Sequence, residues 1–223
     1  FYTALYHAML APNLYMDVDR RYRGRDLAVH EATDFDYYTV FSLWDTFRAA
    51  HPLFTIIEPE RTVDFIHTFL AQHEQGGALP VWELSANETD CMIGYHAVSV
   101  IADAWAKGIR GFDENAALDA MISTAERDWR GIRAYVERGY VPAEVEGESV
   151  SKTLEYAYDD WCISRMAASL GREEPARRFA CRAQSWANLF DPRSRFMRAR
   201  VEGAWRAPFD PSEVNVDYTC LLY

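Results

Sequence analysis

Apolar residues recur at helical spacing along most of this chain, in two alternating kinds of segment. Segments that begin near residues 45, 90 and 155 are apolar and aromatic on most faces, whereas those that begin near 60, 113 and 173 are amphipathic. A helix that is apolar all round is normally buried, and an amphipathic helix turns one polar face to water. The alternation therefore predicts an all-α fold, an α/α toroid of inner and outer helices. A helical-repeat solenoid would alternate similarly, but no repeat of fixed period supports it.

The periodicity predicts about eight helical segments, which span residues 1–10, 39–51, 60–73, 90–107, 113–128, 130–138, 149–161 and 173–190. Strand candidates are few and lie in the connections. Residues 196–206 alternate weakly around Glu202-Gly203 and predict a short hairpin. The connection over residues 11–36 is polar and irregular, and a loop of this length is usually functional.

The segment over residues 149–161 combines this apolar character with three carboxylates. It begins with hydroxyl residues and then carries Glu155, Asp159 and Asp160 among aromatic side chains. A buried carboxylate is costly unless it is paired, hydrogen-bonded or bound to a cation. The two aspartates point to different faces, so we expect one to accept structural hydrogen bonds and the other to reach an acidic, aromatic-lined pocket.

The charge balance excludes one class of partner. A formal net charge of −11 and a pI near 5.0 argue against nucleic acid, since phosphate binding needs a basic surface. No apolar run approaches the ~20 residues that span a bilayer, so no membrane segment is expected. Aromatic residues make up 14% of the chain. Rings and carboxylates together suit sugar binding, although a large aromatic core explains them equally well.

The four cysteines form no C-x-x-C motif, so they indicate neither a metal centre nor a redox site. Cys91, Cys162 and Cys181 fall in helical patterns and are interpreted as small core residues. Cysteine usage leaves the cellular compartment undetermined.

Polar clusters lie near the expected starts of the inner helices. They are residues 41–48, residues 82–89 before the helix that carries His96, the carboxylates that begin at Glu155, and residues 215–219. In a toroid these helix starts converge on one mouth, so the clusters are candidates for a single pocket.

Each candidate residue has a structural explanation beside the functional one. Asp45 and Arg48 suit a simple i, i+3 ion pair, or a carboxylate that grips sugar hydroxyls beside a Trp44 platform. His96, on an apolar helix, is more often a core histidine than a catalyst.

Glu83 and Glu88 flank a polar turn. Capping of the next helix and interaction with its dipole explain Glu88 best. Glu83, beside Trp82 in an apolar context, is the stronger pocket candidate. No metalloprotease, P-loop or serine-nucleophile motif is present, which leaves carboxylate chemistry such as glycoside hydrolysis, with Glu155 or Glu83 as a candidate group.

Several long strings identify a family resemblance. FYTALYHAMLAPN, YYTVFSLWDTFRAAHPL, LPVWELSANETDCMIGYH, VSKTLEYAYDDWC and NLFDPRSRFMRAR closely resemble glycoside hydrolase family 92, the exo-acting α-mannosidases. The resemblance runs from Phe1 to Thr219. It implies an (α/α)6 catalytic toroid packed against a β-sandwich, and hydrolysis of terminal α-mannose from mannans or N-glycans with inversion. It also implies a secreted, periplasmic or cell-surface protein.

The resemblance further implies a calcium ion that binds sugar hydroxyls, since calcium accepts many oxygen ligands in flexible geometry. We expect residues 1–223 to be the central part of the catalytic domain, with the β-sandwich, the rest of the toroid and most calcium ligands outside this chain. Those missing domains would then be its partners, together with α-mannosides. No metal ligand is assigned to this chain.

By the resemblance, Asp45 holds the terminal mannose, and Trp82, Glu83 and the acids after Lys152 form the pocket wall or support it. The family pattern continues DYTEGNAWQY, whereas here Thr219 is followed by Cys220. The missing glutamate is the best candidate for the general acid. We therefore expect an α-mannosidase-like chain that is inactive alone and has no assigned catalytic residue.

The alternatives are a non-catalytic carbohydrate-binding or helical scaffold domain, and another toroid enzyme such as a lyase or a trehalase-like hydrolase. The proposed substrate contacts are Trp44, Asp45, Arg48, Trp82, Glu83, Glu88, His96, Glu155 and Asp159.

Overall fold

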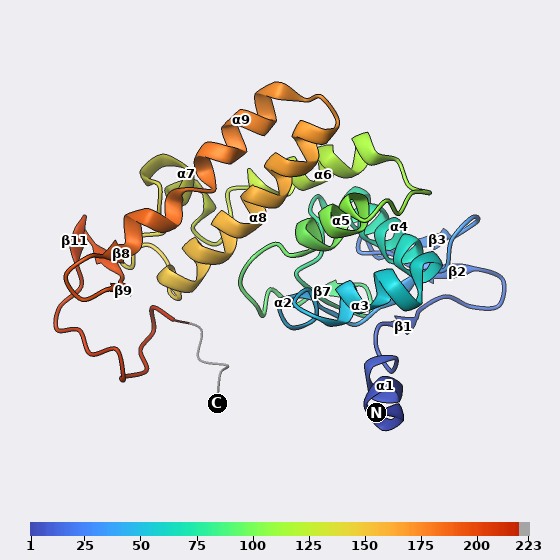
Figure 1. Cartoon of the computed structure of the whole chain (residues 1–223). Helices are drawn as coiled ribbons and strands as arrows, with labels where there is room; N and C mark the ends of the chain where they lie inside the picture. The colour runs from blue at the N-terminus through green and yellow to red at the C-terminus, as the bar shows by residue number, and fades with distance from the viewer. Residues whose placement is uncertain (219–223) are drawn as a thin grey trace. The chain divides into compact units, whose positions relative to one another are not determined.

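The computed structural model describes residues 1–218 and divides the chain into two compact units (Figure 1), Phe1–Thr124 and Ala125 onward. The helices of the first unit are α1 (Tyr2–Ala8), α2 (Leu43–Thr46), α3 (Ala50–Ile57), α4 (Pro59–Gly76), α5 (Ala97–Ala106) and α6 (Glu114–Ala125, whose last residue begins the second unit). Its strands are β1 (Asn13–Leu14), β2 (Arg21–Arg23), β3 (Val29–Glu31), β4 (Tyr38–Thr39), β5 (Phe41–Ser42), β6 (Trp82–Leu84) and β7 (Asn87–Glu88).

Within its described part, the second unit contains three α-helices, one 3-10 helix and four short strands. They are α7 (Ile132–Arg138), α8 (Ser149–Ser169), α9 (Glu173–Arg182), the 3-10 helix η1 (Ser185–Leu189), β8 (Phe190–Asp191), β9 (Phe196–Met197), β10 (Arg200–Val201) and β11 (Ala204–Trp205). The prediction of a mostly helical chain is confirmed, with small antiparallel sheets added. The closed toroid stays a prediction.

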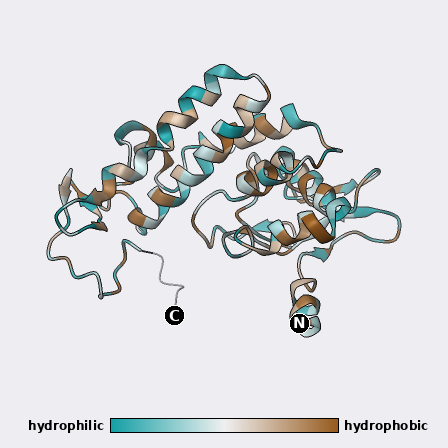
Figure 2. Ribbon diagram, in the orientation of Figure 1, coloured by the Kyte–Doolittle hydropathy of each residue, from teal (hydrophilic) through white to brown (hydrophobic). Residues whose placement is uncertain are grey.

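The core of the first unit forms where α3 and α4 pack together and against β5. Helix α4 starts with Pro59 in its first turn and ends at Gly77, whose φ of +76° suits glycine and closes the helix. Its apolar stripe buries Phe65, Ile66 and Phe69, as the i, i+3, i+4 spacing predicts. Figure 2 shows this mixture of hydrophobic and hydrophilic residues along the helices.

One polar side chain lies inside this aromatic core. His51 is 1% exposed, and its ring lies 5.5–6.5 Å from the rings of four phenylalanines, which are Phe41, Phe54, Phe65 and Phe69. Neither ring nitrogen has a hydrogen-bond partner within the described residues. Burial lowers the pKa of His51 to about 3, so the ring is neutral at physiological pH.

The expected helix over residues 39–51 is wrong at its start. Thr39 lies in β4 and residues 41–42 form β5, with Val40 between them at a φ of +67°. Helix α3 begins only at Ala50. The β-branched and aromatic residues here favour a strand, and β6, about 40 residues later in the chain, supplies the pairing that helical spacing cannot detect.

The expected helix over residues 90–107 begins seven residues late, at Ala97. Asp90 and Gly94 both have positive φ, of 54° and 78°, which a helix does not allow. The Glu88 carboxylate also accepts a hydrogen bond from the Asp90 amide at 3.1 Å and holds this loop outside a helix.

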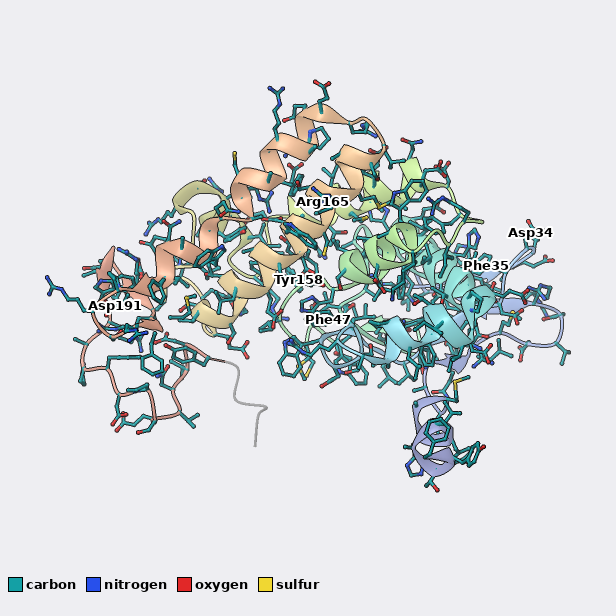
Figure 3. The ribbon with its side chains drawn as sticks, in the orientation of Figure 1. Asp34, Phe35, Phe47, Tyr158, Arg165 and Asp191 are labelled. Atoms are coloured by element: carbon teal, nitrogen blue, oxygen red, sulfur yellow. The ribbon has the colours of Figure 1, made fainter. Side chains whose placement is uncertain are left out.

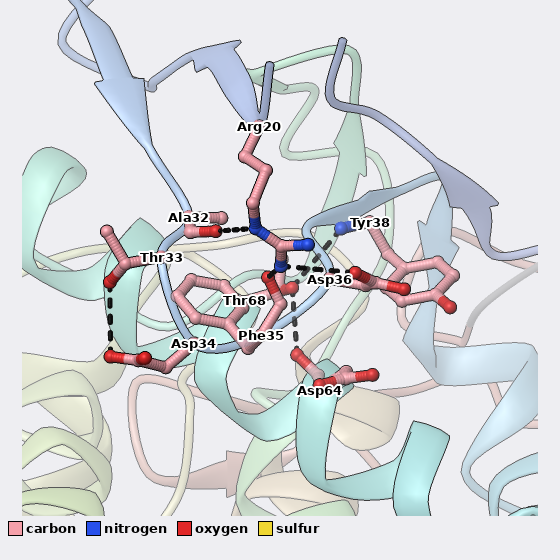
Figure 4. A network of polar contacts seen from close by, with 9 residues as sticks. All are labelled: Arg20, Ala32, Thr33, Asp34, Phe35, Asp36, Tyr38, Asp64 and Thr68. Atoms are coloured by element: carbon pink, nitrogen blue, oxygen red, sulfur yellow. Dashed lines mark hydrogen bonds and ion pairs between the residues drawn. The ribbon is translucent and has the colours of Figure 1, made fainter. Parts of the chain in front are cut away.

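The connection over residues 11–36 is more ordered than predicted, since it contains β1 and the β2–β3 hairpin. Arg20 fixes its far end, as Figure 4 shows. The guanidinium donates to the carbonyls of Ala32 at 2.5 Å and Phe35 at 2.6 Å, and pairs with Asp36 at 3.2 Å. In residues 32–36, which follow β3, side-chain hydrogen bonds from Arg20 therefore satisfy backbone carbonyls that no strand or helix pairs.

Two of the cysteine interpretations are wrong. Cys162 is buried in α8 as expected, but Cys91 and Cys181 are exposed. Cys91 lies in the loop before α5, and Cys181 lies on the outer side of the amphipathic helix α9. Cys220 lies outside the described residues.

Candidate functional site

The sheet β5–β6–β7 brings together two of the polar clusters. Ser42 pairs with Trp82 across β5 and β6, and Glu83 pairs with Glu88 across β6 and β7. Helix α2 follows β5 directly and carries Asp45 in its first turn. Residues about 40 positions apart in the chain therefore form one surface of the first unit.

Asp45 is exposed at this surface, and its carboxylate accepts a short hydrogen bond from the Ser42 hydroxyl. The neighbouring Trp44 is buried, at 7% exposure, so its side chain packs helix α2 against the interior of the unit. This arrangement fixes the direction of the Asp45 carboxylate, while its remaining lone pairs stay available to a ligand.

Arg48 and Phe47 form an aromatic edge beside Asp45. The Arg48 guanidinium lies 5.0 Å from the Trp44 ring centroid and 4.5 Å from that of Phe47, within cation–π range. Phe47, labelled in Figure 3, stacks on His96 with ring centroids 4.0 Å apart. His96 is 1% exposed and directly precedes α5, so it is a packed core histidine in this structure.

Glu83 is a buried carboxylate inside the sheet, with no exposed surface. It accepts hydrogen bonds from the Thr39 hydroxyl at 2.9 Å and from the Ala86 amide at 2.6 Å. Burial raises the pKa of Glu83, and these hydrogen bonds oppose the rise. The geometry places Glu83 behind the surface, where it supports the β6–β7 hairpin.

Glu88 closes the same hairpin from its other end. Its two carboxylate oxygens accept hydrogen bonds from the amides of Val81 and Trp82, each at 2.8 Å. Glu88 therefore does not cap the next helix as expected, because the amides that it binds lie at the start of β6 and in the loop after β7 rather than in α5. Trp82, which is half-buried, is thereby fixed beside Ser42.

The remaining candidates lie on α8 in the second unit. Asp160 is fully buried and pairs with both Nε and Nη2 of Arg182 at 3.0 Å, while the Tyr135 hydroxyl donates to it at 2.7 Å. This confirms one structural acceptor on the helix. Asp159 is also fully buried and Glu155 is half-buried.

Helix α8 is not buried on every face. Tyr158 is 41% exposed and Trp161 is 51% exposed, and their rings stack on each other with centroids 6.4 Å apart. This exposed aromatic pair and Arg165 lie on a solvent-facing side of α8.

The structure thus assembles seven predicted residues around α2, β5–β7 and the start of α5. These are Trp44, Asp45, Arg48, Trp82, Glu83, Glu88 and His96. That Glu155 and Asp159 join them in one pocket stays a prediction. Sequence reasoning missed the parts played by Thr39, Ser42 and Phe47, although a hydroxyl residue three positions before Asp45 was a usable signal.

Residues 1–218 contain no group of three or more His, Cys, Asp or Glu side chains arranged to hold a metal ion. Within the same range, no helix is both long enough and apolar enough to cross a bilayer.

Residues 1–220 match the catalytic domain of glycosyl hydrolase family 92. Among solved structures, a family 92 α-mannosidase from Bacteroides thetaiotaomicron is 47% identical, with a TM-score of 0.95 over 98% of this chain and 30% of its own. A complex of that enzyme with mannoimidazole gives a TM-score of 0.93 over 95% of this chain and 28% of its own. An inverting family 92 mannosidase from the same species is 37% identical, with a TM-score of 0.92 over 98% of this chain and 31% of its own.

A protein of Arthroderma benhamiae described as an uncharacterized secreted glycosidase is 30% identical over 157 residues, which are 63% of this chain and 20% of that protein. This chain thus spans less than a third of the length of these relatives. The match over nearly the whole chain, and the Asp45 surface that the same sequence strings build, lead to one assignment. The chain belongs to glycoside hydrolase family 92.

Proposed function

We propose that this chain forms the mannose-holding part of an α-mannosidase catalytic domain that acts on terminal α-mannose of mannans or N-glycans. Two observations support the proposal. The solved relative at 47% identity is an α-mannosidase that binds mannoimidazole, a mannose-like ligand. In this chain, Asp45 presents an exposed carboxylate on a surface that Trp44, Arg48 and the β5–β7 sheet hold in place.

The chemistry of this surface suits a sugar. A carboxylate accepts hydrogen bonds from two neighbouring hydroxyls, and such charge-assisted bonds are about twice as strong as neutral ones. The Ser42 hydroxyl donates to one side of Asp45 and so orients it toward the ligand. Trp82 and the Arg48 edge offer apolar and cationic surface beside it. Glu83 and Glu88 contribute by fixing the hairpin rather than by contacting the sugar.

Inverting hydrolysis requires a general acid and a general base about 6.5–9.5 Å apart, with a water between the base and the sugar. The family pattern implies a glutamate as the acid, directly after the threonine that aligns with Thr219, and this chain has Cys220 there. A thiol at that position does not replace a carboxylic acid. We therefore infer that the chain binds mannose without cleaving its glycosidic bond.

Calcium and cellular location follow the family in this proposal. Most ligands of the calcium ion that the family implies would lie outside this chain. The relative from Arthroderma benhamiae carries the description of a secreted glycosidase. We propose that this chain likewise works outside the cytoplasm, where mannans and N-glycans are met.

Replacement of Asp45 by Ala is the direct test of the sugar contact. We expect methyl α-mannoside to bind the wild-type chain and to lose at least about tenfold in affinity, since a hydrogen bond to a charged group contributes about 1.5–3 kcal/mol. Titration calorimetry measures the change. Asp34→Ala, an exposed carboxylate in the β3–β4 connection (Figure 3), is the matched control and should bind as wild type. Equal affinities for all three proteins would remove Asp45 from the site.

Cleavage is tested separately with α-1,2-linked mannobiose and calcium. We expect no release of free mannose by the chain, as followed by chromatography over a day, because the acid position holds Cys220. A family 92 mannosidase serves as the positive control. Steady release by the chain would refute the assignment of the acid, while leaving the Asp45 contact in place.

A further inference from the structure

The last described part of the second unit contains a cavity of about 590 Å³ that none of the nine proposed substrate contacts lines, although Asn215, Asp217 and Tyr218 belong to the polar cluster predicted over residues 215–219. Its wall comes from residues 199–218, which include β10, β11 and the irregular segment after them. Volumes of roughly 300–1,000 Å³ are typical of small-molecule sites. Its wall combines aromatic rings with hydrogen-bonding groups, namely Trp205, Phe209, Asp210, Glu213 and Asn215.

Arginines hold the aromatic wall from behind. The Arg200 guanidinium lies 4.0 Å from the Trp205 ring centroid, and that of Arg198 lies 4.6 Å from the Phe209 centroid. Arg198 also pairs with Asp191 at 2.7 Å, and this bond lowers the pKa of Asp191 to about 2 (Asp191 is labelled in Figure 3). Trp205 and Phe209 thus line the cavity while arginine side chains pack against their rings.

The far side of the cavity is anchored on helix α8. The amides of Glu148 and Val150 donate to the carbonyls of Val216 at 2.6 Å and Asp217 at 2.9 Å. The buried Asp217 carboxylate pairs with Arg206 at 3.0 Å. The end of the cavity-lining segment at Val216–Asp217 is thus fixed to the start of α8, and Arg206 is fixed to Asp217.

The charges of the wall select the ligand class. Among the described lining residues, the carboxylates of Asp210, Glu213 and Asp217 outnumber the guanidinium of Arg206. This excess of negative charge disfavours phosphates and uronic acids. Carboxylates and the Asn215 amide suit hydroxyl groups, and an aromatic face suits the C–H face of a pyranose.

We propose that this C-terminal cavity binds a neutral pyranoside, with Trp205 as the stacking surface and Asp210, Glu213 and Asn215 as hydroxyl partners. The inference rests on the proposed function only for the identity of the sugar, which is mannose. The ligand is either a free monosaccharide or a unit within a glycan chain. The cavity supplies a second contact with the sugar that does not depend on Asp45.

The test uses the Asp45→Ala chain, in which the first contact is removed, with methyl α-mannoside and an α-1,2-linked mannobiose as probes. Saturation-transfer NMR is expected to show residual binding of a mannoside. Adding Trp205→Ala, or Glu213→Ala as a change with little effect on packing, should weaken it about tenfold, which is 1.4 kcal/mol. Trp186→Ala and Glu173→Ala, exposed residues of the same unit outside the cavity, are the matched controls and should change nothing.

The outcomes separate the two proposals. Absence of residual binding in the Asp45→Ala chain, or binding unchanged by both cavity variants, overturns the cavity assignment and leaves the Asp45 site standing. Binding that is insensitive to Asp45→Ala but lost with the cavity variants supports the cavity and removes Asp45. Tighter binding of the mannobiose than of the methyl mannoside identifies a glycan unit as the ligand, and equal affinities identify a monosaccharide.

Discussion

Replacing Asp160 with Ala is expected to lower the free energy of unfolding of the second unit by about 3–5 kcal/mol, because it leaves a buried charge without its partner. Asp160 is fully buried, and the Arg182 side chain that it binds is only 11% exposed. The Tyr135 hydroxyl loses its acceptor at 2.7 Å in the same change. A loss of this size is a large part of the total stability of a small unit.

Urea unfolding followed by far-ultraviolet circular dichroism measures the effect of Asp160→Ala. Asp128→Ala is the control, since Asp128 and its partner Arg133 are both about 70% exposed or more and should cost less than about 1 kcal/mol. The double variant Asp160→Leu with Arg182→Met should recover much of the loss, because no buried charge remains. A loss below about 1 kcal/mol for Asp160→Ala would show that water reaches Arg182.

The first unit is expected to lose stability in mild acid through His51. The folded pKa of His51 is about 3 and its ordinary value is 6.5, so the unfolded chain binds the proton more readily. The stability is fully present above pH 6.5 and falls as the pH decreases toward 3. At pH 4.5, one such histidine contributes a loss of about 2–3 kcal/mol.

Comparison with His51→Leu isolates this contribution, because carboxylates that titrate in the same range act in both proteins. The wild type should lose about 2–3 kcal/mol more than the variant between pH 7 and pH 4.5, by urea unfolding at each pH. His7→Leu changes an exposed histidine of α1 and should follow the wild-type profile. Parallel profiles for wild type and His51→Leu would mean that the His51 ring finds a proton acceptor or water inside its cage of phenylalanines.

Local hydrophobic periodicity was enough to predict a helix where the whole apolar pattern lies within one stretch of the sequence. The apolar stripe of α4 predicts that helix almost to its observed ends. The acidic start of α9 predicts its first residue, Glu173, but the predicted end at residue 190 is wrong, because α9 ends at Arg182 and the 3-10 helix η1 follows. The failure over residues 39–51 has a different cause. Residues 41–42 are a strand because residues 82–83 pair with them, and no window of local sequence contains both. Strand pairing over such separations is decided by tertiary contacts.

The candidate site shows the same division. Trp44, Asp45 and Arg48 were recognisable in the sequence as a polar cluster within an aromatic run, and they do form one surface. For Glu83, residue spacing predicted a pocket contact and only the family resemblance allowed a supporting position, because its burial depends on Thr39 from another strand and on the backbone turn at Ala86. The exposure of Cys91 likewise depends on the loop that delays the start of α5.

The bonds between α8 and the segment at Val216–Asp217 also bear on the order of synthesis. A ribosome releases the start of α8 almost 70 residues before the carbonyls that satisfy its first amides. Domains generally fold as units during translation. The first unit can therefore complete its core while the second is still emerging, whereas α8 waits for residue 217. A chaperone or protease that acts on nascent chains would therefore have access to the incompletely folded second unit for longer than to the first.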